Sequence, residues 1–266
     1  MADLADAIES MEQLTVVWRD MVLDRDPGAD VRELPGIAVR WADSRFAFWN
    51  CVTLTEVGAE AGLVAQRLGS AADIMRSKRR PGFLWLFEDL LAEEARTRLA
   101  EAAEQAGLEH AFPGTGMAGN LLPLAEPHHP DLTFVRVTTD AQLQDYADLN
   151  SRAYGFPPAD GRDGLGASDL WKSRAWAWLA LRDGVPVACA ATVAADGRLF
   201  VALVATAPEW QHRGYGEAVT RKALYEGARA TGLTRATLHA TPAGAPVYRR
   251  IGFQPNSTIH FYRLRS

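Results

Sequence analysis

The chain has little of several features that mark whole classes of protein. Only two cysteines occur among its 266 residues, Cys51 and Cys189, and each lies in an apolar run. This arrangement is typical of buried thiols and gives no indication of zinc or redox chemistry. No run of about 18 apolar residues could cross a bilayer, and the acidic N-terminal segment MADLADAIES does not resemble a signal peptide. We therefore expect a cytoplasmic protein with no membrane partner.

An excess of basic residues is also missing. The 33 Asp and Glu outnumber the 28 Lys and Arg, which gives a net charge of −5 at pH 7. Proteins that bind nucleic acid usually present a basic face, so no nucleic-acid partner is expected. The adjacent His128 and His129 have no cysteine or carboxylate cluster beside them, and no metal site is predicted. The length is sufficient for one large domain or two of ordinary size.

Apolar periodicity predicts alternating helices and strands in the first part of the chain. We expect helices over residues 2–24, 60–75 and 93–106, the last ended by Gly107, and strands over 36–41, 46–53 and 83–87. The proline-rich stretch from Pro123 to Pro130 shows no periodicity and indicates a linker. The predicted division is a first domain at 1–125, a linker at 126–132 and a second domain at 133–266.

The second part begins with a predicted strand at 133–137 and a helix at 141–154, capped by the preceding Thr-Thr-Asp. A loop is expected at 155–170. A hairpin of strands 175–181 and 185–193, joined at Asp183-Gly184, leads to a buried strand at 199–205. A helix at 217–231, a strand at 235–241, a short helix at 245–250 and a strand at 258–264 follow. The fold class is therefore α/β (α+β), with a mixed, mostly antiparallel central sheet flanked by helices.

The turn after the 199–205 strand carries the most informative motif. Its sequence QHRGYG, residues 211–216, places Gly214 and Gly216 between a buried strand and a helix. Glycine allows the backbone to approach a phosphate closely, and the free N–H groups of a first helical turn favour an anion. Arg213 adds a positive charge. No Gly-Lys-Ser/Thr follows, and Val219 stands where a dinucleotide fingerprint has its third glycine, so neither a Walker loop nor a Rossmann motif is indicated.

This strand, turn and helix resemble the acetyl-CoA site of the GNAT N-acetyltransferase family, which has the turn pattern Q/R-x-x-G-x-G/A. The resemblance implies a GNAT-like fold in which the strand end pairs with the pantetheine arm of acetyl-CoA and the turn binds its pyrophosphate. It also implies a coenzyme contact at Thr241, where many family members have Asn. The residues so expected to bind the co-substrate are Val204, Ala205, Thr206, Gln211, His212, Arg213, Gly214, Tyr215, Gly216, Glu217 and Thr241.

A second stretch, APVYRRIGF at 245–253, resembles the family's short helix with its Tyr-x-x-x-Gly-Phe pattern. By this resemblance Tyr248 is the catalytic acid that protonates the leaving thiolate, a role suited to a phenol that is protonated at neutral pH. The alternative is that Tyr248 only packs against Ile251 and Phe253. No acidic residue stands where some members have a glutamate base, so the base is open: His239, or an ordered water if His239 is only a packing residue.

The acceptor is less defined. The 155–170 loop carries Asp160, Asp163 and Asp169, which either hold a cationic amine or belong to a flexible solvated loop. Trp176 and Trp178 share a strand face and either stack on a substrate ring or belong to the core. The first part of the chain resembles a degenerate GNAT-like domain that shapes the acceptor cleft, and it has no glycine-rich turn for coenzyme A.

The sequence therefore predicts an N-acetyltransferase that moves an acetyl group from acetyl-CoA to a primary amine of a small molecule by direct attack. An aminoglycoside-like or other cationic amine is the candidate acceptor. Two alternatives stay open, a protein or peptide N-acetyltransferase and a non-catalytic acyl-CoA-binding sensor module. A monomer or a homodimer is expected.

Overall fold

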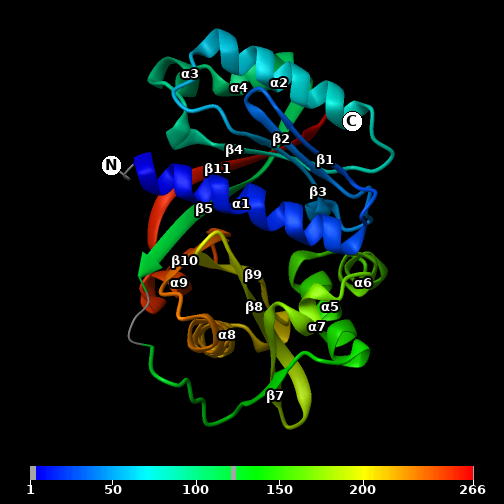
Figure 1. Cartoon of the computed structure of the whole chain (residues 1–266), viewed down its shortest axis with the longest axis vertical. Helices are drawn as coiled ribbons and strands as arrows, with labels where there is room; N and C mark the ends of the chain where they lie inside the picture. Colours follow the sequence, from blue (N-terminus) through cyan, green and yellow to red (C-terminus); the bar gives the residue numbers. More distant parts are fainter. Residues whose placement is uncertain (1–3, 121–123, 266) are drawn as a thin grey trace.

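The computed structural model describes residues 4–120 and 124–265, and their strands form one continuous mixed sheet (Figure 1). The strand order is β1-β2-β3-β4-β11-β5-β10-β9-β8-β7-β6. The pairs β3–β4 and β9–β10 are parallel, and the other neighbouring pairs of the described sheet are antiparallel. Helices flank the sheet. The predicted α/β class, with a mostly antiparallel mixed sheet, is confirmed.

We call residues 4–120 the first half and residues 124–265 the second half. The elements of the first half are α1 (Leu4–Arg25), β1 (Asp30–Leu34), β2 (Ile37–Trp41), η1 (Ala47–Trp49), β3 (Asn50–Leu54), α2 (Ala61–Arg76), β4 (Phe83–Phe87), η2 (Glu88–Leu90), α3 (Glu93–Thr97), α4 (Leu99–Gln105) and β5 (Leu108–Asn120). Those of the second half are β6 (Thr133–Arg136), α5 (Asp140–Tyr154), α6 (Pro158–Gly166), α7 (Leu170–Ser173), β7 (Trp176–Arg182), β8 (Val185–Ala195), β9 (Arg198–Thr206), η3 (Pro208–Trp210), α8 (Tyr215–Thr231), β10 (Arg235–Ala240), α9 (Ala245–Ile251) and β11 (Gln254–Leu264).

The predicted elements of the second half are present, and their end signals act as expected. Thr139 caps α5 in a capping box with Gln142. Asp183 and Gly184 both have positive φ angles, which suits the tight turn between β7 and β8. Gly232 ends α8 in the left-handed conformation.

The loop predicted at 155–170 is wrong, because helices α6 and α7 occupy most of it. The glycines in this stretch permit close packing. A Cβ on Gly161 would lie 2.1 Å from Oγ of Ser151 in α5, and one on Gly164 would lie 2.6 Å from Cβ of Phe46. The glycines that indicated a loop therefore lie in the short helix α6, which packs closely against Ser151 of α5 and against Phe46.

The first half shows smaller differences from the prediction. The helix predicted at 93–106 is interrupted at Arg98, and the strand predicted at 46–53 begins only at Asn50, after the 3-10 turn η1. Strand β1 and most of β5 were not predicted. Residues 2, 3 and 123, which belonged to predicted segments, lie outside the described residues. Residues 124–132 contain no helix or strand, and the division into two domains at 126–132 stays a prediction.

Strands β5 and β11 connect the two halves. Strand β5, from the first half, pairs with β10 of the second half, with Thr237 opposite Ala118. Strand β11, from the end of the chain, pairs with β4 of the first half, with Phe261 opposite Trp85. The two exchanged strands also pair with each other. Each half therefore contributes a central strand that lies next to the sheet of the other.

The sheet separates two layers of core. On one face, α1 and α5 to α7 cover a core rich in aromatic side chains. On the other face, α2 to α4 cover the first half, and α8 and α9 cover the second. Strand β4 shows the alternation that separates the layers, because Trp85 and Phe87 enter the first core and Leu84 and Leu86 enter the second. No helix of the described chain combines the length and apolar character that crossing a bilayer requires.

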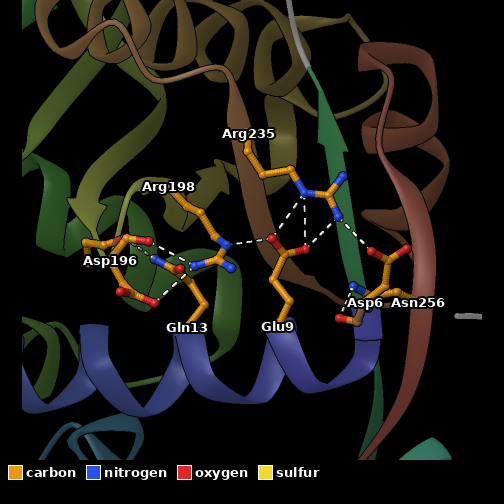
Figure 2. A network of polar contacts seen from close by, with 8 residues as sticks. Asp6, Glu9, Gln13, Asp196, Arg198, Arg235 and Asn256 are labelled. Carbon is orange, nitrogen blue, oxygen red and sulfur yellow. Dashed lines mark hydrogen bonds and ion pairs between the residues drawn. The ribbon is translucent and has the colours of Figure 1, made fainter. Parts of the chain in front are cut away.

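Helix α1 crosses the middle of the molecule and is tied to the second half by a carboxylate network (Figures 1 and 2). Glu9 accepts hydrogen bonds from Arg198, at the start of β9, at 2.5 Å and from Arg235, at the start of β10, at 2.6 Å. Asp6, one turn earlier, accepts from Arg235 at 2.7 Å. Burial opposes ionisation of Glu9, but the hydrogen bonds from Arg235 and Arg198 outweigh it and hold its pKa below the ordinary value.

Candidate active site

Strands β9 and β10 pair at their first residues and then separate. Their parallel register ends at Leu238 opposite Val201, although β9 continues to Thr206. The pairing of β9 with β8 is also irregular after Ala202, where Leu203 has a φ of +48°. This bulge directs the end of β9 away from β10. The backbone of residues 204–206 is therefore without a strand partner on the β10 side.

Two tyrosines of α5 support the bulge. The Tyr146 hydroxyl donates to the carbonyl of Leu203 at 2.9 Å, and the Tyr154 hydroxyl donates to the carbonyl of Val204 at 2.8 Å. Burial raises the pKa of both phenols well above the ordinary value, so both stay protonated and act as donors. The strained φ of Leu203 is thus stabilised by hydrogen bonds from a rigid helix.

The turn between β9 and α8 leaves its backbone amides free for an anion. Gly214 is the N-cap of α8 with a φ of +80°, and no side chain caps the helix. His212 also has a positive φ, +61°. A Cβ on Gly216 would lie 2.8 Å from Oγ1 of Thr206, so glycine is needed where the helix passes the strand end. In the described structure no side chain caps the first N–H groups of α8, and binding of a pyrophosphate to them stays a prediction.

The acidic residue in this turn is neutralised. Glu217 accepts hydrogen bonds from Arg221 at 2.9 Å and from Arg250 at 2.8 Å. Burial opposes its ionisation, but these bonds from Arg250 and Arg221 outweigh it and hold the pKa of Glu217 below its ordinary range. Because two guanidinium groups face one carboxylate, Glu217 does not present an unpaired negative charge to a phosphate.

A cavity of about 550 Å³ lies between the turn, the end of β9 and helix α9. The residues predicted to bind the co-substrate or to act in catalysis that line it are Val204, Ala205, Thr206, Gln211, His212, Gly214, Tyr215, Gly216, Glu217, Thr241 and Tyr248. The exception is Arg213, whose guanidinium lies 5.1 Å from the ring centre of Trp210. We call this space the donor cavity.

Tyr248, on α9, is 8% exposed and lines the donor cavity. Within the described chain no group is hydrogen-bonded to its hydroxyl. Its ring packs edge-on against Phe253, 6.1 Å between centres, in agreement with the packing alternative. Burial, followed by the nearby Tyr154, raises its pKa well above the ordinary value, and the phenol is therefore protonated at ordinary pH.

Thr241 and Gln211 serve partly to hold the backbone. The Thr241 hydroxyl accepts a hydrogen bond from the backbone N–H of Gly244 at 3.1 Å, which shapes the approach to α9. The Gln211 amide donates to the carbonyl of Thr206 at 3.5 Å and so joins the turn to the strand. Both residues still line the donor cavity.

His239, the candidate base, lies in an apolar setting. Its Nε2 is 3.1 Å from the hydroxyl of Ser10 on α1, and its ring contacts Trp85, Phe87 and Phe200 edge-on. Burial lowers its pKa to about 3, so the imidazole is neutral at ordinary pH and accepts a proton poorly. Its Nδ1 has no hydrogen-bond partner in the described structure.

The side chains predicted to hold a cationic acceptor lie elsewhere. Asp163 is bound by Arg25, the Ser44 hydroxyl and the Arg45 backbone N–H at 2.9 to 3.0 Å. Asp169 is paired with Lys172. None of Asp160, Asp163 and Asp169 lines the donor cavity.

Trp176 and Trp178 are also absent from the donor cavity. Trp178 packs beneath α8, where the ammonium of Lys222 lies 4.7 Å from its ring centre. This contact favours the packing alternative for Trp178.

The strand, turn and helix around the donor cavity match a known domain. Residues 173–255 match the sequence model described as the acetyltransferase (GNAT) domain. Residues 173–255 form a GNAT domain. The match contains β7 to β10, α8 and α9, and with them the glycine turn and Tyr248.

Solved structures similar to this chain extend the likeness beyond the GNAT domain. A GCN5-related N-acetyltransferase from Kribbella flavida has 20% identity and a TM-score of 0.68, over 94% of this chain and 95% of that chain. One from Sphaerobacter thermophilus has 17% identity and a TM-score of 0.60, over 86% and 76%. A tandem GNAT protein from the clavulanic acid biosynthesis pathway has 14% identity and a TM-score of 0.55, over 80% and 74%. At these identities the likeness establishes the fold. A search of curated sequences gives no match.

A second, smaller cavity adjoins the GNAT domain and was not predicted from the sequence. It has a volume of about 80 Å³ and shares Tyr154, His239 and Thr241 with the donor cavity. We call it the aromatic pocket. Its remaining aromatic walls come from both halves of the chain and are Trp18, Phe48, Trp85, Phe112, Phe200 and Phe261. The apolar runs FAFW and FLWLF were the available signal, but they indicated only buried strands.

Proposed function

We propose that the protein is an acetyl-CoA-dependent N-acetyltransferase that acetylates the primary amine of a small molecule. One observation carries the proposal. The uncapped N-terminus of α8, with Gly214 and Gly216, opens onto a cavity that Tyr248 also lines. An anion site and a proton donor in one cavity are what transfer from a phosphate-bearing thioester requires.

The residues present fit acetyl-CoA. The amides at the start of α8 and the backbone at Gly214 suit a pyrophosphate, and Gly216 leaves the space that a Cβ would fill. The backbone of residues 204–206, which has no strand partner on the β10 side, suits the two amides of a pantetheine arm, because such a group adds to a strand edge as a peptide does. When bound there, acetyl-CoA supplies the activated acetyl group.

The chemistry assigned to the chain is a direct transfer. The neutral amine forms the new C–N bond as the C–S bond of the thioester breaks, and Tyr248 gives its phenolic proton to the departing sulfur. The proton that the amine loses returns to Tyr248 through water, so the products are an amide and a thiol. No covalent enzyme intermediate is needed. Both cysteines are fully buried, which supports this assignment.

The test compares the wild type with Tyr248→Phe. Acetyl-CoA binding is measured by calorimetry, and thiol release is measured with a panel of primary amines. We expect both proteins to bind acetyl-CoA with similar Kd and kcat to fall about 100-fold or more in the variant, since general acid catalysis contributes on that scale. If neither protein binds acetyl-CoA, the proposal fails. If both bind it and neither acetylates an amine, a sensor module is the better description.

A further inference from the structure

The aromatic pocket differs in chemistry from the acceptor site that the sequence predicted. None of its described lining residues is Asp, Glu, Lys or Arg. Trp85, Phe200 and Phe261 are at most 5% exposed, and Phe48 and Phe112 are half-buried. The ring centres of Phe112 and Phe261 lie 4.4 Å apart with the rings nearly parallel, and those of Trp85 and Phe261 lie 4.2 Å apart. These contacts restrict the movement of the pocket walls.

The aromatic pocket lies beside the reacting end of the donor cavity. Both cavities are lined by Tyr154, His239 and Thr241, where β9 and β10 have separated. Tyr248 lines the donor cavity near this shared wall, because a Cβ on Gly244 would lie 3.1 Å from Cε2 of Tyr248 and 3.3 Å from Oγ1 of Thr241. A group seated in the aromatic pocket can therefore present an amine toward the place where the thiol departs.

We propose that the acceptor is a primary amine carried by a compact aromatic group, and that this group binds in the aromatic pocket. This inference rests on the proposed function and narrows its acceptor. A flat apolar ring gains from aromatic walls through burial and ring contacts. A polycation such as an aminoglycoside needs carboxylates, and the carboxylates predicted to bind it do not line this pocket: Asp163, for example, is held by Arg25 and Ser44.

Two polar atoms in the walls have no partner within the described residues. They are the indole N–H of Trp85 and Nδ1 of His239. Both residues line the aromatic pocket, and buried polar groups are rarely left unpaired in native proteins. They suit an acceptor whose ring or chain carries a hydroxyl or carbonyl group, which would satisfy one of them.

The uncharged walls of the aromatic pocket also explain how the amine can lose its proton without a general base. An ammonium moved from water into a site without a carboxylate loses solvation, and its pKa falls. The proton then leaves to water before or during binding, and the amine arrives ready to attack. His239 need not accept it, because burial keeps this imidazole neutral. The pocket thereby performs by desolvation what family members with a glutamate do with a base.

The test measures kcat/KM with acetyl-CoA for phenylethylamine, butylamine, spermidine and kanamycin. It also measures binding of phenylethylamine by calorimetry to the protein saturated with coenzyme A. We expect phenylethylamine to bind and to exceed butylamine and the two polycations by about tenfold or more in kcat/KM, since burying a ring instead of a short chain is worth more than 1 kcal/mol. Equal or better use of spermidine or kanamycin would overturn the inference.

Variants separate this inference from the donor site. Phe112→Ala should lower kcat/KM for phenylethylamine about tenfold, lower that for butylamine less, and leave the Kd of acetyl-CoA nearly unchanged. Phe112→Leu should recover part of the loss. The matched control is Phe134→Ala, which removes a half-buried ring on β6 that lines neither cavity. Equal losses in Phe112→Ala and Phe134→Ala would contradict the inference.

A donor series distinguishes the amine from the acyl group as the occupant. If benzoyl-CoA replaces acetyl-CoA with equal or higher kcat/KM, the aromatic pocket holds the acyl group and the inference is overturned. Binding of acetyl-CoA without turnover of any amine overturns it as well. If the protein does not bind acetyl-CoA at all, the proposed function itself is wrong. Calorimetry distinguishes this outcome from the others.

Discussion

At the scale of single residues, Gly214 and Gly216 serve the same turn for different reasons. A Cβ on Gly216 would collide with Thr206, whereas the surroundings of Gly214 are open, with His129 Nε2 3.9 Å away as the nearest atom. Gly214 is required by its φ of +80°, which side chains with a branched Cβ rarely adopt. A side chain at position 216 would therefore clash with Thr206, whereas a side chain at position 214 would strain the backbone.

Gly214→Val is expected to weaken acetyl-CoA binding while the protein stays folded. Strain of this kind costs about 1–3 kcal/mol, so relaxation of the turn should raise Kd by about tenfold or more. Calorimetry measures Kd, and circular dichroism checks the fold. Gly184→Val is the matched control, because Gly184 has a φ of +78° and open surroundings in the β7–β8 hairpin. An unchanged Kd in Gly214→Val would contradict the role of the turn.

The donor side of the site was predictable because its residues are close in sequence. The QHRGYG turn and Tyr248 lie within about forty residues of each other, and local patterns specify both the turn and the short helix. The aromatic pocket was not predictable. Its walls come from α1, η1, β4, β5, α5, β9, β10 and β11, and the strand exchange brings the two halves of this set together. The prediction that acidic residues bind the acceptor gains no support from the structure, because Asp163 is engaged in packing contacts.

At the scale of elements, helix α1 holds strands β9 and β10 together. We call the contact of Glu9 with Arg198 and Arg235 the clasp. Through Glu9 the helix joins the starts of β9 and β10 (Figure 2), while the opposite ends of the same two strands separate at the donor cavity. Holding two parallel strands together at one end makes their separation at the other end a fixed feature of the fold. We expect this clasp to contribute to stability in a pH-dependent way.

Glu9→Gln is expected to destabilise the protein by about 2 kcal/mol at pH 7, because two half-buried guanidinium groups each lose one of their two carboxylate partners. The folded pKa of Glu9 is lowered, so its contribution is full above the ordinary glutamate pKa of about 4.3 and is lost as the pH falls through the lowered value. Urea unfolding at pH 7 and at pH 3.5 measures the change. The difference between wild type and variant should shrink in acid.

Glu12→Gln provides the control for this measurement, because Glu12 is exposed on the same helix and its side chain makes no ion pair in the described structure. If Glu9→Gln and Glu12→Gln have equal effects, or if the effect of Glu9→Gln is the same at both pH values, the clasp does not stabilise the fold as stated.

Most elements followed from periodicity and capping, and the exceptions have physical causes. Strand β5 contains Pro113 and several glycines, which usually disfavour a central strand. Here the glycines allow close neighbours: a Cβ on Gly114 would lie 2.8 Å from Phe261, and one on Gly119 would lie 2.9 Å from the carbonyl of Gly252. Strand β1 is charged and lies at the edge of the sheet, so it has no apolar pattern to detect.

At the scale of the whole molecule, the two halves are joined by strands and not only by the connecting segment. Strand β5 lies between β11 and β10, and β11 lies between β4 and β5. The order of elements along the sequence predicted two tandem units, but sequence order alone cannot show which sheet a strand joins. Pairing across the halves depends on contacts far apart in the chain, and local patterns do not encode those contacts.

Separate expression of residues 1–125 and 126–266 tests this arrangement. We expect each fragment alone to be unfolded or aggregated, because β5 or β11 would lack a partner and expose an edge in the middle of an apolar core. Co-expression should restore a soluble pair that binds acetyl-CoA. The measurements are solubility, circular dichroism and calorimetry. A folded 126–266 fragment that binds acetyl-CoA by itself would show that the second half is independent.

The position of β11 also has a consequence for the timing of synthesis. Of the described strands it is the last to be synthesised, yet it fills the place between β4 and β5, which are made much earlier. The edges of β4 and β5 that face β11 therefore stay unpaired until residues 254–264 emerge. A nascent chain of this protein should depend on chaperones for longer than one whose domains close in order of translation. Ribosome-bound chains that stop before residue 254 should remain sensitive to protease across both halves.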